Sequence, residues 1–462
     1  MEVRVGTNGK FDVVVVGGGS GGYSTALRAA QLGLDVALVE RDLLGGTCLH
    51  RGCIPTKAFL HAAEIADGAR EAGTFGVRAA FGGIDPAALA TFKNGVVTRL
   101  HRGLEGLLAA ADKITVVRGT GKLVSPTSVS VDGTELSGSA IVLATGSVAR
   151  VLPGLEPGGR VLTSTEALEL SEVPASVVIV GGSTIGVEFA SLWKSFGAEV
   201  TVLEALPRLV PQEDPMLSRH LERAFRKRGI GVRKETRVAG IEPREENVVV
   251  LLESGEKIEA EYVLSAVGRA PATAGIGLEE LGIVLDDGWI RTNERLVTDV
   301  PGVYAVGDVV RGLQLAHRGF AHGIFVAEEI AGLDPEPVRD DSIPRVTYCD
   351  PELASVGLTE AEARKRYGDV QTYEYNLGGN GRSQILGTTG VVKLVRAIDG
   401  PVVGIHMIGT RMGEQSGEAA LTLASGLPPH ELARLIHAHP TQGEALGEAA
   451  LALAGKPLHS HP

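Results

Sequence analysis

The chain has few of the residues that mark several other classes of protein. It contains three cysteines in 462 residues, too few for a small secreted scaffold stabilised by disulfides. No run approaches the roughly 18 consecutive apolar residues of a transmembrane helix. The opening residues, Met1 to Thr7, lack the charged-then-apolar pattern of a secretory signal. These absences predict a cytoplasmic protein that does not enter a membrane.

Positive charge is also in the minority. Lys and Arg total 44 against 56 Asp and Glu, a net charge of −12, and no basic block occurs. Nucleic acid and anionic membranes are therefore not expected as partners. Glycine, in contrast, is abundant at 62 residues without a collagen-like period, which predicts many tight turns of the kind that nucleotide-binding α/β proteins use. The length implies about three domains.

The N-terminal region has the pattern of a dinucleotide-binding βαβ unit. A β-branched run at residues 11–16 precedes a glycine-rich turn, a helical stretch to Leu32 and an apolar run that ends at Glu40. The glycines of such a turn let a pyrophosphate approach the helix N-terminus, and the acid binds ribose hydroxyls. An ordinary strand-to-helix turn is the alternative, but the spacing favours dinucleotide binding. The glycines are Gly17, Gly19 and Gly22.

The same plan returns over residues 177–204. Gly181 and Gly186 are retained, and 23 positions separate Gly181 from Glu204, as they separate Gly17 from Glu40. Ser183 stands in place of the middle glycine and adds a Cβ where the phosphates would lie, so a decayed site is the alternative to a working one. The acid at position 204 favours a free ribose hydroxyl and hence NAD over NADP.

The rest of the chain carries further element signals. We expect a helix over 86–111, a hairpin within 115–136 that turns at Asp132-Gly133, a buried strand at 141–146, a strand over 303–308 that ends in Asp308, and a helix over 316–331. After about residue 342 the pattern changes to antiparallel strands and helices, including a capping box at Thr359-Glu360-Ala361-Glu362. This last third has no glycine fingerprint, and we expect it to serve packing or subunit contact.

Two cysteines, Cys48 and Cys53, lie five positions apart. In a regular helix that spacing gives about 8 to 9 Å, beyond the roughly 7 Å limit for a disulfide, so a bridge requires a distorted turn, which the nearby glycines and Pro55 permit. Spacing alone leaves a redox pair and two buried free thiols evenly balanced. The adjacent fingerprint favours the redox pair. Cys349 is expected to be a plain buried thiol.

A second candidate for chemistry lies near the C-terminus. His439 precedes a predicted helix whose first turn contains Glu444. The acid either closes a capping box with Thr441 or orients the histidine for acid–base work, and without further context the cap is preferred. The tail histidines, His459 and His461, are expected to belong to a frayed terminus rather than to a metal site, and no metal is expected.

Together these residues resemble the pyridine nucleotide-disulfide oxidoreductases nearly end to end. The similarity rests on the redox segment from Gly45 to Lys57, on further flavin- and nucleotide-domain motifs and on the C-terminal His439-Pro440-Thr441 with Glu444. The further motifs are Ala144-Thr145-Gly146, Val267-Gly268-Arg269-Ala270-Pro271 and Val303 to Asp308. In this context Glu444 is assigned the functional role, with a cap role alongside.

The resemblance implies an α/β fold with two Rossmann-like FAD- and NAD(P)-binding domains and an α+β C-terminal dimerisation domain. The boundaries expected are 1–150 and 272–341 for the FAD domain, 151–271 for the NAD domain and 342–462 for the interface domain. The implied cofactors are FAD at the first fingerprint and NAD at the second. The implied cofactor-binding residues are Gly17, Gly19, Gly22, Glu40, Arg41, Gly46, Thr47, Lys57, Thr145, Gly146, Asp308, Gly181, Gly186, Glu188, Glu204 and Gly268.

The same resemblance implies an activity: oxidation of dihydrolipoyl groups with NAD. In a homodimer, His439, polarised by Glu444, would deprotonate the dithiol, which attacks Cys48 of the partner subunit. Cys53 would leave as a thiolate against the flavin, and Lys57 and Glu188 would pair near it. No lipoyl-type domain is expected ahead of the first strand. The lipoyl group is therefore expected on the acyltransferase of a 2-oxoacid dehydrogenase complex.

Several departures and alternatives accompany this resemblance. His50-Arg51 replaces a common Asn-Val, and two cationic groups there are expected to favour thiolates and raise the reduction potential, unless both side chains are merely exposed. Ala272 replaces a frequent Asn, with minor effect expected.

The alternative functions are an NAD(P)H-dependent reductase of another low-molecular-weight disulfide and a non-catalytic flavoprotein scaffold.

Overall fold

The computed structural model describes residues 10–459, which form two compact units. Unit 1 comprises the described residues up to Ala58 together with Ala87–Arg150 and Gly268–Asp340, and unit 2 comprises Phe59–Pro86, Val151–Val267 and the described residues from Asp341. The opening segment examined for a secretory signal, and His461, lie outside the described residues. Each unit is described by itself.

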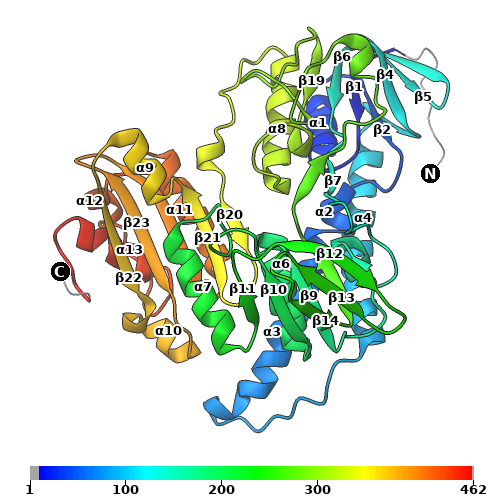
Figure 1. Ribbon diagram of the computed structural model, residues 1–462. Helices are drawn as coiled ribbons and strands as arrows, with labels where there is room; N and C mark the ends of the chain where they lie inside the picture. Colours follow the sequence, from blue (N-terminus) through cyan, green and yellow to red (C-terminus); the bar gives the residue numbers. More distant parts are fainter. Residues whose placement is uncertain (1–9, 460–462) are drawn as a thin grey trace. The chain divides into compact units, whose positions relative to one another are not determined.

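Unit 1 is built on a seven-stranded sheet that combines a parallel set with an antiparallel hairpin extension (Figure 1). The strand order is β3-β2-β1-β6-β5-β4, and β19 pairs in parallel with β6. The valines of β1 are fully buried, as a parallel strand covered on both faces requires. The strands are β1 (Lys10–Val16), β2 (Val36–Glu40), β3 (Ile114–Arg118), β4 (Gly121–Ser125), β5 (Ser128–Val131), β6 (Thr134–Leu143) and β19 (Val303–Ala305).

The helices of unit 1 follow the predicted βαβ pattern. α1 (Ser20–Gln31) packs so closely against α8 (Ala316–Ile330) that a Cβ at Gly323 would lie 2.1 Å from Ser24 Oγ. The remaining helices are α2 (Gly46–His50), the start of α3 (Cys53–Glu71), and α4 (Pro86–Ala110). The expected hairpin turn is confirmed: Asp132 and Gly133 both have positive φ, 48° and 89°, between β5 and β6.

The first part of unit 2 repeats the βαβ plan around a five-stranded parallel sheet with the order β11-β10-β9-β15-β8. Its strands are β8 (Val161–Leu162), β9 (Ser176–Val180), β10 (Glu199–Leu203), β11 (Gly231–Arg233) and β15 (Tyr262–Ser265). An antiparallel sheet of β12 (Val238–Pro243), β13 (Val248–Leu252) and β14 (Lys257–Ala260) accompanies it. The helices are α5 (Ser164–Ala167), α6 (Thr184–Phe196) and α7 (Pro215–Lys227).

The C-terminal part of unit 2 is an antiparallel five-stranded sheet, in the order β20-β21-β24-β23-β22 (Figure 1). Helices α11 and α13 contact the face that carries Val392 and Leu394, whereas α7 and α9 contact the sheet through the face that carries Lys393 and Val395. The strands are β20 (Arg345–Thr347), β21 (Glu352–Gly357), β22 (Val370–Asn376), β23 (Val391–Ala397) and β24 (Val402–Gly409). The helices are α9 (Glu360–Tyr367), α10 (Gly381–Leu386), α11 (Ser416–Ala424), α12 (Pro429–Leu432) and α13 (Glu444–Leu453).

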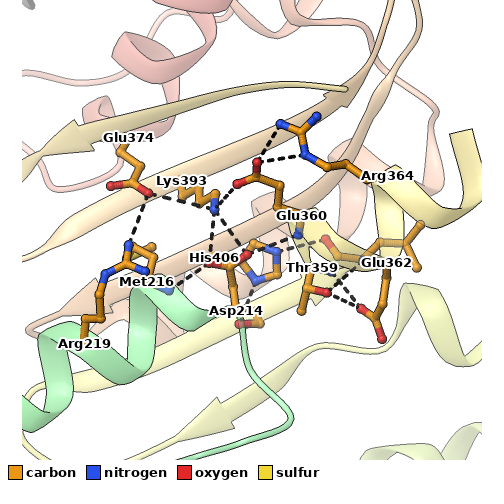
Figure 2. Close-up of polar contacts among 12 residues, drawn as sticks. Asp214, Met216, Arg219, Thr359, Glu360, Glu362, Arg364, Glu374, Lys393 and His406 are labelled. Atoms are coloured by element: carbon orange, nitrogen blue, oxygen red, sulfur yellow. Dashed lines mark hydrogen bonds and ion pairs between the residues drawn. The ribbon is translucent and has the colours of Figure 1, made fainter. Parts of the chain in front are cut away.

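A buried ion network joins α7 and α9 to this sheet (Figure 2). Lys393 Nζ lies 3.1 and 3.2 Å from the two oxygens of Asp214 and 2.7 Å from Glu360 Oε2, while the Asp214 side chain is 0% exposed. Burial raises the pKa of Asp214, but the Met216 amide, His406 and Lys393 outweigh it and leave this pKa below its usual value. Asp214 also caps α7 through the Met216 amide, so one carboxylate fixes both the helix and the sheet contact.

Replacing Lys393 with Met is expected to lower the free energy of unfolding at pH 7 by about 3–5 kcal/mol, because it leaves the Asp214 carboxylate buried and unpaired. The loss should shrink as the pH falls toward 4, where protonation of Asp214 removes the unpaired charge. Urea titrations at pH 7 and pH 4.5 measure both effects. Adding Asp214→Asn, which keeps a capping side chain, should recover part of the loss. Equal losses at both pH values would contradict this account.

Candidate active site and nucleotide-binding sites

The first glycine turn has the shape that the fingerprint predicts. Gly17 has φ of +105°, and a Cβ at Gly22 would lie 1.7 Å from Gly17 O, so helix and strand approach as only glycine allows. Gly19 is the N-cap of α1, and a Cβ there would meet only Gly46 Cα at 3.9 Å. The open space at the helix N-terminus suits a pyrophosphate. Glu40 accepts the Gly18 amide at 2.6 Å.

The second turn repeats this geometry in unit 2. Gly181 has φ of +109°, a Cβ at Gly186 would lie 1.9 Å from Gly181 O, and Glu204 accepts the Gly182 amide at 2.7 Å. Ser183 is an exposed N-cap with φ of −87°, an unstrained conformation in which serine is favoured. The backbone therefore tolerates the substitution, and its effect on NAD binding stays a prediction.

The redox segment is a helix that breaks between the two cysteines. α2 ends at His50, Arg51 departs from helical geometry with φ of −137° and ψ of 14°, and α3 begins at Cys53. The distorted turn that a bridge between the two cysteines requires is therefore present. The side chains of both cysteines are half-buried. A hydrogen bond with Cys53, followed by burial, raises the pKa of Cys48, whereas the Lys57 charge lowers it.

The redox segment lies directly on the first glycine turn. The Gly45 amide donates to Gly18 O at 2.8 Å, and a Cβ at Gly46 would lie 2.7 Å from Gly19 Cα. Gly46 and Thr47 therefore stand beside the position that the pyrophosphate would occupy. Residues nearly thirty positions apart form one surface within unit 1.

The positive charge expected at His50 is not borne out, and the effect of His50 and Arg51 on the reduction potential stays a prediction. Arg51 Nη2 pairs with Asp42 Oδ2 at 2.5 Å, and the His50 ring contacts Leu44 O at 2.9 Å. Burial lowers the pKa of His50, so the ring is mainly neutral at pH 7. Lys57 is the cation that lowers the pKa of Cys48.

Strand β7 (Ser147–Ala149) connects three of the motifs. It directly follows residues 144–146 and pairs with β16 (Arg269–Pro271), and its first residue contacts Asp308. Ser147 Oγ donates to Asp308 Oδ2 at 2.6 Å, and Arg269 Nε donates to Ser147 Oγ at 2.7 Å. Ser147 and Arg269 were not predicted as site residues; Arg269 was visible within its motif, but only the strand pairing shows its contact. Thr145 Oγ1 is buried without a hydrogen-bond partner, as a hydroxyl beside a cofactor would be.

The backbone amide of Ala272 donates to Gly146 O at 2.9 Å, a contact that any side chain at position 272 permits. Gly268, with φ of +105°, accepts the Arg150 amide, and Arg41 is exposed beside Glu40. These residues also belong to unit 1.

His439 and Glu444 form an imidazole–carboxylate pair in unit 2. His439 Nδ1 lies 2.8 Å from Glu444 Oε1, while Glu444 Oε2 accepts the Thr441 amide at 2.7 Å. Only this contact of the expected capping box forms, because Gly443 is the N-cap and Thr441 Oγ1 donates to Ala438 O. Burial raises the pKa of Glu444, but Thr441 and His439 outweigh it and lower this pKa. The His439 side chain is 76% exposed, which leaves Nε2 available to a substrate.

Lys57 and Glu188 lie in different units, and their ion pair stays a prediction. Within unit 2, the buried Glu188 carboxylate accepts the Tyr348 amide at 2.9 Å. In the described residues, no group of three or more His, Cys, Asp or Glu is arranged to hold a metal ion, and His459 instead contacts Glu448 Oε1 at 2.9 Å. None of the helices within residues 10–459 combines the length and apolar character that a membrane crossing requires.

Comparison with known families agrees with these sites. Residues 11–323 match the family described as pyridine nucleotide-disulphide oxidoreductase, and residues 343–450 match its dimerisation domain. The chain belongs to this family. The predicted family and fold class are thereby confirmed, and as a pyridine nucleotide-disulphide oxidoreductase the chain carries the domain through which such proteins dimerise.

Curated relatives of this oxidoreductase cover nearly its whole length. A dihydrolipoyl dehydrogenase of Bacillus subtilis is 41% identical, over 97% of this chain and 99% of the relative. One from Thermus scotoductus is 39% identical, over 97% and 98%, and a leghemoglobin reductase of Glycine max is 39% identical, over 97% and 88%.

Solved structures are similar too. LpdA from Mycobacterium tuberculosis has a TM-score of 0.89 at 25% identity, covering 96% of this chain and 99% of its own. The HOCl-induced flavoprotein disulfide reductase RclA from Escherichia coli has a TM-score of 0.85 at 29% identity, covering 95% and 99%.

Proposed function

We propose that this oxidoreductase oxidises dihydrolipoyl groups to lipoyl groups with NAD as acceptor, as a dihydrolipoyl dehydrogenase. The observation that carries the proposal is the pair of half-buried thiols, Cys48 and Cys53, at a helix break that lies on the Gly17–Gly22 turn. The relatives named dihydrolipoyl dehydrogenase, at about 40% identity over nearly the full length, support the choice of substrate.

The residues of unit 1 fit FAD. The open space at Gly19 leaves a helix N-terminus for the pyrophosphate. The hydroxyl of Thr145 is a hydrogen-bonding group without a partner, and the carboxylates of Glu40 and Asp308 can accept hydroxyls. FAD, when bound, accepts an electron pair from a dithiol and passes a hydride to a nicotinamide. Ser147 donates to the Asp308 carboxylate and accepts from Arg269, so the two residues fix the position of this carboxylate.

The side chains divide the proton and sulfur chemistry between them. His439 Nε2 removes a proton from one substrate thiol, while Glu444 holds Nδ1. The thiolate attacks Cys48 Sγ of the partner subunit's disulfide, and Cys53 leaves as a thiolate. The second substrate thiol then attacks the mixed disulfide and closes the lipoyl disulfide, while Cys48 leaves and takes the proton of that thiol. Two electrons thus pass to the Cys48–Cys53 pair, one proton to His439 and the other to Cys48. The arrangement requires a homodimer, which the dimerisation domain supports.

The second glycine turn is assigned to NAD, with Gly181 and Gly186 at the pyrophosphate and Glu204 at the adenosine ribose. The Glu204 carboxylate would repel a 2′-phosphate, which is the reason to prefer NAD over NADP. The proposal also includes the domain boundaries 1–150, 151–271, 272–341 and 342–462. It places the enzyme in the cytoplasm, with a lipoyl-bearing acyltransferase as partner.

A steady-state assay of the purified holoenzyme with dihydrolipoamide tests the proposal, with NAD and NADP run in parallel. We expect turnover with NAD and a kcat/KM at least about 10-fold lower with NADP, since one unfavourable charge contact costs more than about 1.4 kcal/mol. No turnover with either nicotinamide, although FAD is bound, would overturn it. Reduction of other small disulfides by NADH or NADPH would then favour the reductase, and its absence the scaffold.

A further inference from the structure

A second imidazole–carboxylate pair lies beside the first. His437, two residues before His439, has its Nε2 2.7 Å from Oε1 of Glu418 on α11. Its side chain is only 14% exposed, in contrast to the 76% of His439. This half-buried ring faces Glu418 rather than open solvent, so it is placed to act through its neighbours.

The His437 ring packs on the N-terminal turn of α13, the helix that begins with Glu444. A Cβ at Gly447 would lie 2.7 Å from His437 Nδ1, and a Cβ at Gly443 would lie 3.7 Å from its Cδ2. The glycines on either side of Glu444 therefore make room for this ring. A side chain at Gly447 would push the ring away from the helix start, whereas one at Gly443 would only touch it.

The surroundings of His437 favour its protonated form. The Glu418 hydrogen bond raises the pKa of His437 most; burial opposes it, and the charge of Glu444 and a hydrogen bond with the Leu435 backbone add to the increase. The charge of His437 in turn helps to lower the pKa of Glu444. The titratable groups that face the ring are Glu418 from α11 and Glu444 from α13.

We propose that Glu418 and His437 are positioning residues for the His439–Glu444 pair: the His437 cation, anchored by Glu418, holds the Glu444 carboxylate ionised and in place, so that Glu444 orients His439. This inference rests on the proposed function, in which His439 is the base. It gives a role to the charge of His437, which lowers the pKa of Glu444 alongside the contacts of this carboxylate with His439 and the Thr441 amide.

The experiment compares the holoenzyme with His437→Gln and His437→Lys. In His437→Gln the positive charge beside Glu444 is lost, so Glu444 stabilises the protonated form of His439 more strongly. The acidic limb of the kcat/KM profile for dihydrolipoamide should therefore move to higher pH by roughly 0.5–1 unit. At pH 6 the rate should fall by about 3- to 10-fold. His437→Lys keeps the charge and should restore most of the limb position. His430→Gln, at an exposed histidine 3.7 Å from Glu431, is the matched control and should move nothing.

NMR titration of the histidine rings, with His439 assigned by His439→Ala, gives a readout that needs no substrate. It should show the same upward shift in His437→Gln, and FAD content and melting temperature establish that each variant folds. An unmoved limb and an unmoved His439 titration in a folded His437→Gln would overturn the inference. A wild type that fails to oxidise dihydrolipoamide, while its His439 titration still depends on His437, would refute the proposed function alone.

Discussion

Replacement of Cys48 by serine is expected to abolish NAD-dependent oxidation of dihydrolipoamide, to the background of the assay. Serine cannot form the disulfide that accepts electrons from the substrate, and no other thiol is placed to take over, because Cys349 is buried and donates to Pro351 O. Oxidation of NADH by ferricyanide bypasses the disulfide and should persist with bound FAD. Cys53→Ser should give the same loss.

The two cysteine variants also test which thiol meets the substrate. In Cys53→Ser, lipoamide should form a mixed disulfide at Cys48, which mass spectrometry of peptides would locate. Cys48→Ser should form none, because Cys53 is assigned to the flavin side. Cys349→Ser is the matched control and should retain turnover. A mixed disulfide at Cys53 instead would exchange the two roles, and full activity in either variant would refute the redox pair.

Replacement of His439 by alanine is expected to lower kcat/KM for dihydrolipoamide by about 10²–10⁴-fold, the usual contribution of a general base. The thiol then has no group to take its proton, although both cysteines and both nucleotide turns remain. In stopped-flow experiments, reduction of the flavin by dihydrolipoamide should slow by the same factor, whereas reduction by NADH should not change.

The control for His439 is His459, whose ring also contacts a carboxylate, Glu448, at 2.9 Å. His459→Gln should keep the wild-type rate. Glu444→Gln should lower the rate less than His439→Ala. Glutamine can still accept a hydrogen bond from Nδ1, but it no longer stabilises the charge of the imidazolium. An unchanged rate of flavin reduction by dihydrolipoamide in His439→Ala would eliminate this histidine as the base.

Features encoded by short stretches of sequence were predictable. The two βαβ units, the Asp132-Gly133 hairpin and the Thr359 capping box follow from periodicity and turn chemistry over a few residues, and the structure confirms each. The break between Cys48 and Cys53 was predictable only for a redox pair, because five positions apart in a regular helix their Cα atoms are too distant for a disulfide.

Local patterns also misled where tertiary partners decide the outcome. Thr441 and Glu444 have capping-box spacing, yet one oxygen of Glu444 binds His439, and the Thr441 hydroxyl bonds to Ala438 O. His50 and Arg51 have the pattern of two cations, but burial lowers the pKa of His50, and Asp42 pairs with Arg51. In each case the competing partner or the burial is invisible to spacing.

The sequence by itself determined the two nucleotide turns, the redox segment and the C-terminal His–Glu pair, because each is built from residues close along the chain. The tertiary structure alone decided which distant groups meet: Ser147 with Asp308, Lys393 with Asp214, and Glu418 with His437. These contacts depend on strand order and helix packing, which sum many weak interactions across the whole fold. No local pattern of residues encodes that sum, and so the groups that position the reactive side chains became visible only in the folded chain.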